Sequence, residues 1–120
     1  MYKIDKSIDL TPLTGNEVTQ VCIGLCSVEI RLTNEMSIDI SGQYKLEKNG
    51  SIFLNGYAEE DSDTNKMLVC LLHQSIESAT VVTENILAVN FSNDYCLHLI
   101  DDSEQYESFI IRCQTFELIV

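Results

Sequence analysis

The stretch that decides the fold covers residues 28–40, VEIRLTNEMSIDI, and its pattern recurs about 59 residues later as LAVNFSNDYCLHL over residues 87–99. In both copies an apolar residue stands at every second position on either side of a polar triplet, Thr33-Asn34-Glu35 first and Ser92-Asn93-Asp94 second. Such alternation is typical of half-buried β-strands, and a short polar segment between two of them predicts a hairpin. We therefore expect a duplicated β-hairpin.

Further strands and tight turns surround the hairpins. The alternation ends at Gln43-Tyr44 in the first half and at Gln105-Tyr106, three residues later, in the second. Asn49-Gly50 and Asn55-Gly56 predict tight turns, because both central positions of a type I′ turn need positive φ. More strands are expected at 17–25 (with Val21, Ile23 and Leu25 on one face), 51–54, 76–83, 109–112 and 116–120.

One segment, about 63–74, has helical spacing. Asp63 is expected to cap it, and its buried stripe is expected to hold Met67, Leu68, Leu71 and Leu72. The expected fold is α+β and mainly antiparallel β, with two pseudo-repeated meanders forming a sandwich or partly open barrel and one helix between the halves. We expect a single domain over residues 1–120, with the repeat at about 17–56 and 75–120.

The composition indicates an acidic protein in a reducing environment. Its 120 residues are 45% hydrophobic, and 19 acidic against 7 basic residues give a formal charge of −12. That charge disfavours binding to nucleic acid or to anionic lipid. No apolar run is long enough for a membrane span and the N-terminus lacks a secretion signal, so a cytoplasmic protein is expected. Five cysteines, an odd number, then predict free thiols rather than a disulfide framework.

Residues 61–65 resemble the start of a calcium-binding loop. Asp61, Asp63 and Asn65 stand at alternate positions, where oxygen ligands suit a hard cation. However, Lys66 occupies the position that needs glycine, and Leu72 occupies that of the bidentate acid. The sequence favours a solvated helix cap here.

Other metal and catalytic signatures are weak. Cys22, Cys26, Cys96 and His98 are residue types that bind zinc, but their spacing is not that of a zinc knuckle. His98 corresponds in the repeat to Asp39, an outward position, which predicts an exposed histidine rather than a base. No nucleophile elbow, phosphate loop or dinucleotide fingerprint occurs. We therefore expect no metal, no cofactor and no enzyme activity.

Acidic residues gather in two segments, each beside a tyrosine. The candidate partner-binding residues are Tyr57, Glu59, Glu60, Asp61 and Asp63 in the first segment and Asp101, Asp102, Glu104, Tyr106 and Glu107 in the second. Clustered charge speeds association with a basic partner, and tyrosine is a frequent anchor at protein interfaces. The two segments predict either a protein-binding surface or a pair of ordinary solvated loops.

Three segments resemble a family of small uncharacterised bacterial β-rich proteins: DLTPLTGNEVTQVCIG at 9–24, QYES at 105–108 and ELIV at 117–120. The resemblance implies a β-rich fold and brings no catalytic residues with it. In size and acidity the chain also resembles immunity proteins of bacterial toxin systems, including contact-dependent growth inhibition. Such proteins bind and neutralise a cognate toxin domain, often a basic nuclease.

The leading hypothesis is a non-enzymatic immunity protein that binds a basic toxin domain through the acidic loops. A second hypothesis is a homo-oligomeric structural or small-ligand-binding β module, for example a homodimer with a shared cleft. A third is a small hydrolase, which a buried cluster of acids with perturbed pKa values in a pocket would favour.

Overall fold

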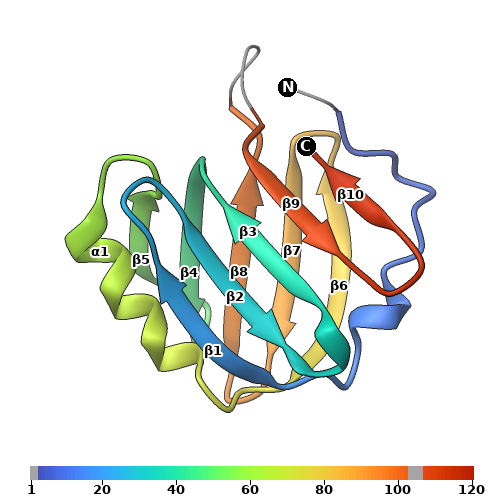
Figure 1. The fold of residues 1–120 in the computed structure, drawn as a ribbon, viewed down its shortest axis with the longest axis horizontal. Helices are drawn as coiled ribbons and strands as arrows, with labels where there is room; N and C mark the ends of the chain where they lie inside the picture. The colour runs from blue at the N-terminus through green and yellow to red at the C-terminus, as the bar shows by residue number, and fades with distance from the viewer. Residues whose placement is uncertain (1–2, 103–106) are drawn as a thin grey trace.

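The computed structural model, which describes residues 3–102 and 107–120, is a sandwich of two antiparallel five-stranded sheets (Figure 1). Sheet 1 holds, in spatial order, β1 (Val18–Ile23), β2 (Val28–Leu32), β3 (Ser37–Ile40), β9 (Phe109–Arg112) and β10 (Glu117–Ile119). Sheet 2 holds β5 (Ser51–Tyr57), β4 (Gln43–Lys48), β8 (Tyr95–Ile100), β7 (Ile86–Phe91) and β6 (Ile76–Thr83). This architecture confirms the expected fold class.

The two hairpins, β2–β3 and β7–β8, have the same register. Val28 pairs with Ile40 in the first, and Leu87, 59 residues later, pairs with Leu99 in the second. The turn of the first, η2 (Thr33–Glu35), has φ of 61° and 60° at Asn34 and Glu35, and Asn93 and Asp94 both have φ of 61°. Asn and Asp adopt this left-handed conformation more readily than most residues, so the polar triplets set both turns.

Each repeat is divided between the two sheets. Strands β1–β3 stay in sheet 1 while β4 and β5 cross to sheet 2, and β6–β8 stay in sheet 2 while β9 and β10 cross to sheet 1. Tyr44 of β4 pairs with Leu99, just as Phe109 of β9 pairs with Ile40. The counterpart of Tyr44 is therefore Phe109, and the predicted counterpart, Gln105-Tyr106, lies outside the described residues.

The core fills the space between the sheets and extends under two flanking segments. Tyr44, Phe91 and Phe109 are among its largest fully buried side chains. On one side, α1 (Ser62–Lys66) and η3 (Met67–Leu71) lie beside β5 and β1, and Leu68 and Leu71 are fully buried there (Figure 1). On the other side, the segment that contains η1 (Thr11–Leu13) lies beside β6. Both flanks cover sheet edges that would otherwise be open to pairing.

The helix is shorter than predicted. It begins after Asp61 rather than Asp63, and α1 gives way at Met67 to the 3₁₀ turns of η3, which end at Leu71. A tighter helix rotates each side chain away from its α-helical place. As a result Met67 is 50% exposed and only half of the predicted apolar stripe is fully buried.

One turn prediction and one strand prediction are also wrong. Asn55-Gly56 is not a turn but part of β5, where Gly56 pairs with Tyr44. A Cβ at Gly56 would lie 2.8 Å from the Tyr44 hydroxyl oxygen, so this glycine allows the ring to approach the backbone. Leu25 does not continue the buried face of β1, because the strand ends at Ile23 and Leu25 is 92% exposed.

Candidate functional site

The two acidic loops lie at the same end of the sandwich. Gln43, the first residue of β4, pairs with Tyr57 at the end of β5 on one side and with Ile100 at the end of β8 on the other. Beside it, the backbone N–H groups of residues 41–42 donate to the Ser108 carbonyl, at 2.9 and 2.8 Å. The loops after β5 and β8, distant in sequence, thus flank one crossing segment (Figure 1).

We call this region the acidic end. Its described members are Tyr57, Glu59, Glu60, Asp61, Asp63, Asp101, Asp102 and Glu107. Two predicted residues, Glu104 and Tyr106, lie outside the described part of the chain.

Carboxylates of both loops influence the pKa of the Tyr57 side chain. The pKa of Tyr57 is raised, first by burial and then by the charges of Asp102, Glu59 and Glu60. Across the described residues no ion pair joins a cation to those three carboxylates, whereas the Asp63 carboxylate lies 3.4 Å from the Lys66 ammonium. The structure therefore brings four of the predicted partner-binding residues together from two loops that are distant in sequence: Tyr57, Glu59, Glu60 and Asp102.

A buried polar network holds the first acidic loop in place. The Tyr44 hydroxyl donates to the Asn65 side-chain oxygen at 2.8 Å, and the Asn65 amide donates to the Ala58 carbonyl at 2.9 Å. Asp61 accepts from the Tyr57 N–H at 2.9 Å, so this predicted contact residue also has a structural role in the loop. Burial, followed by the charge of Asp61, raises the pKa of Tyr44 to about 12.

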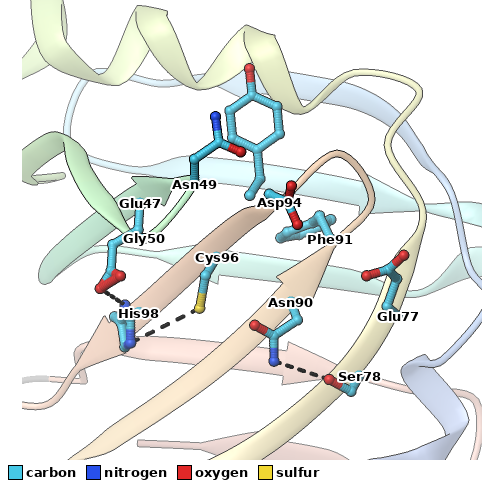
Figure 2. A pocket seen from close by; sticks show the side chains of 11 residues that line it. Glu47, Asn49, Gly50, Glu77, Ser78, Asn90, Phe91, Asp94, Cys96 and His98 are labelled. Atoms are coloured by element: carbon cyan, nitrogen blue, oxygen red, sulfur yellow. Dashed lines mark hydrogen bonds and ion pairs between the residues drawn. The ribbon is translucent and has the colours of Figure 1, made fainter.

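A second candidate site, which the sequence did not suggest, lies on the outer face of sheet 2. It is an open hollow of about 760 Å³, and we call it the sheet-2 concavity (Figure 2). Its floor holds Asn90 and Cys96, with Glu47 and His98 on one side and Glu77 on the other. These residues come from four strands, so no local motif connects them; the repeat predicted only that His98 faces outward.

His98 is more buried than its outward position predicted. Its side chain is 20% exposed, and its Nδ1 atom lies 3.6 Å from a Glu47 carboxylate oxygen without a hydrogen-bond partner. Its Nε2 atom lies 4.0 Å from the Cys96 sulfur. Burial, and then the charge of Glu47, raises the pKa of the Cys96 thiol, which keeps it protonated and weakly nucleophilic.

Of the four candidate zinc-binding residues, only Cys96 and His98 lie next to each other. In residues 3–102 and 107–120, no group of three or more His, Cys, Asp and Glu side chains is placed to hold a metal ion. Cys22 lies in sheet 1 and Cys96 in sheet 2, and all five cysteines are free. Over the same residues, no helix has the length and apolar character needed to cross a membrane.

The acids that line the sheet-2 concavity are not buried, so the feature that would favour the hydrolase hypothesis is not found among them. Glu77 and Asp94 are exposed, and the Glu47 side chain is 27% exposed.

Neither protein-family models, nor curated proteins, nor solved structures give a match to this chain.

Proposed function

We propose that the protein is a non-enzymatic immunity protein that acts in the cytoplasm and neutralises a basic toxin domain by binding it through the acidic end. The observation that supports this most is the position of Tyr57 among Glu59, Glu60 and Asp102, which belong to two loops far apart in sequence. Neighbouring carboxylates create a local negative potential that speeds association with a basic surface. A tyrosine within them supplies an amphipathic anchor.

The hydrogen bonds that hold the first acidic loop in place favour the same proposal. The Tyr44–Asn65–Ala58 network and the Asp61 contact fix the first loop before any partner arrives. A loop that is already ordered loses less conformational entropy on binding. This arrangement suits a stoichiometric inhibitor, because each inhibitor molecule blocks one target molecule and must therefore bind it tightly.

Coexpression with the toxin domain encoded by a neighbouring gene tests the proposal. The protein should restore growth of cells that produce the toxin, and calorimetry should give a tight one-to-one complex with the purified toxin. Loss of growth with no complex, while both proteins are soluble, would contradict the proposal.

A pair of charge reversals tests the surface. Changing Glu60→Lys together with Asp102→Lys should slow association with the toxin about tenfold or more at low salt, and much less at high salt. The matched control is Glu17→Lys with Glu35→Lys, which changes the net charge equally but lies at the opposite end of the sandwich. Equal effects of the two pairs would show that net charge, not the acidic end, controls association.

A second candidate function is a small-ligand-binding β module, and the sheet-2 concavity favours it. Its volume of about 760 Å³ is in the range of pockets that hold small molecules. This candidate also allows a homodimer, which sedimentation of the free protein would detect.

A further inference from the structure

The crossing segment between β3 and β4, residues 41–42, is hydrogen-bonded to both acidic loops. Its two backbone N–H groups donate to the Ser108 carbonyl in the second loop, at 2.9 and 2.8 Å. Its two carbonyl groups accept from the N–H groups of Glu59 and Ala58 in the first loop, at 3.1 and 2.9 Å. Every backbone donor and acceptor of the segment therefore serves to join the two loops.

These bonds lie directly beside the charged residues of both loops. Ser108 is 2% exposed, and its hydroxyl donates to the Asp101 carboxylate at 3.1 Å. Asp102 is the next residue of the second loop, and its charge raises the pKa of Tyr57. Glu59, which donates its N–H to the crossing segment, is another carboxylate that raises this pKa. The segment thus anchors carboxylates that come from two distant parts of the sequence.

Gly42 allows the crossing segment to lie against the second loop. A Cβ at this position would lie 3.0 Å from the Ser108 Cβ and 3.2 Å from the Ser108 Cα. Both distances are shorter than an ordinary carbon–carbon contact of about 3.5–4.0 Å. A larger residue at position 42 would therefore push the Ser108 backbone away. Because Ser108 is hydrogen-bonded to Asp101, this displacement would move the second loop away from the first.

We infer that Gly42 is the positioning residue of the acidic end, and that it joins the two loops into one surface that fits a folded basic domain in contact with both loops at once. The inference rests on the proposed function for the identity of the partner. A flexible basic peptide can follow either loop by itself. A folded basic surface instead gains from carboxylates that are already held in fixed positions, because little conformational entropy is then lost on binding.

Titration of the Tyr57 phenol in the free protein tests the positioning role, because Tyr57 and Asp102 belong to different loops. The ring resonances of ¹³C-labelled tyrosine in NMR spectra follow the titration. Asp102→Asn should lower the pKa of Tyr57 in the wild-type background, since the Asp102 charge raises it. In the Gly42→Val background the decrease should be about half as large or less, because the interaction of two charges weakens with distance. No decrease in the wild type, or equal decreases in the two backgrounds, would overturn the inference.

Gly24→Val is the matched control. A Cβ at Gly24 would also be crowded, at 3.2 Å from the Ser27 side-chain oxygen, but this glycine lies in the turn between β1 and β2. In its background Asp102→Asn should lower the pKa of Tyr57 as it does in the wild type. The same reduced decrease in both glycine variants would show a general loss of order and would overturn the inference. Gly42→Ala, the smaller change, keeps the inference testable if the spectrum of Gly42→Val shows that it does not fold.

Binding of the toxin domain encoded by the neighbouring gene tests the partner. Gly42→Val should weaken binding about tenfold or more although it changes no charge, while Gly24→Val should leave the affinity unchanged. Wild-type affinity in Gly42→Val would overturn the inference and leave the proposed function intact. No binding by the wild type would overturn the proposed function and the assignment of the partner together. The titration of Tyr57 would still decide, in that case, whether Gly42 holds the two loops in place.

Discussion

Replacing Tyr44 with phenylalanine should destabilise the protein at neutral pH and protect it at alkaline pH. The Tyr44 ring is fully buried, and its hydroxyl donates to the side-chain oxygen of Asn65, which is itself fully buried. Without that donor the Asn65 oxygen remains buried with an unmet hydrogen bond. Such a loss costs about 1–2 kcal/mol of unfolding free energy, and this is the expected effect of Tyr44→Phe at pH 7.

The alkaline effect has the opposite sign. The folded protein raises the pKa of Tyr44 from 10.0 to about 12, so it holds the phenolic proton more tightly than the unfolded chain does. The stabilisation from this group is therefore complete below pH 10 and is lost as the pH rises from 10 through 12. Two pKa units correspond to about 2.7 kcal/mol, a loss that the phenylalanine variant cannot suffer. The stability difference should shrink above pH 10 and reverse sign near about pH 11.

Urea unfolding followed by circular dichroism, for both proteins at pH 7 and at intervals up to pH 12, measures this difference. Other groups that titrate in this range are common to both chains and cancel in the comparison. A difference that stays constant with pH would refute the assignment of a raised pKa to Tyr44. Equal stability at pH 7 would refute the role of its hydroxyl in satisfying Asn65.

Three further outcomes can be measured. Gly56→Ala should lower the unfolding free energy by about 1–3 kcal/mol in urea titrations, because its Cβ would lie 2.8 Å from the Tyr44 hydroxyl oxygen; an unchanged midpoint would contradict the close approach. Leu68→Ala should cost about 2–5 kcal/mol in the same assay and Met67→Ala far less, and similar costs would contradict the 3₁₀ rotation of η3. Iodoacetamide should modify exposed Cys26 faster at pH 8 than the half-buried cysteines with raised pKa values, as peptide mass spectrometry would show; uniform rates would refute the ranking.

The parts of the fold that sequence predicted correctly depend on local chemistry. The hairpins need only alternating apolar residues and a triplet whose Asn tolerates positive φ, and both conditions are visible at Asn34 and Asn93. The Asn49-Gly50 turn is predicted for the same reason, and its φ values of 55° and 80° confirm it. Strand pairing within each hairpin then follows from the turn.

The parts that sequence could not predict depend on tertiary contacts. Asn55-Gly56 has the same residue types as Asn49-Gly50, yet it lies in β5 because the Tyr44 ring occupies the space beside Gly56. The switch from α1 to η3 likewise accompanies the full burial of Leu68 and Leu71 in the core, which helical periodicity does not predict.

The candidate sites differ in how far they could be predicted. The acidic residues were visible as clusters, but their meeting at one end follows from the crossing of β4 beside β8, which is a property of topology. The sheet-2 concavity was missed because its residues come from four strands and two turns. Several outward positions of sheet 1 are replaced there, such as Arg31 by Asn90 and Glu29 by Ala88, and these replacements can be recognised only once the register is known.

The differences between the repeats fall where folding places little demand on the sequence. Core positions remain apolar in both copies, as at Ile38 and Leu97, because a polar residue there would be buried without a partner. The crossing from β3 to β4 needs only residues 41–42, whereas the equivalent crossing from β8 to β9 takes residues 101–108. The first crossing shows that the fold does not require the greater length of the second, and the second carries Asp101, Asp102 and Glu107. Loop length beyond what a connection needs commonly serves binding, and the extra length of the second crossing therefore supports the binding role proposed for the acidic end.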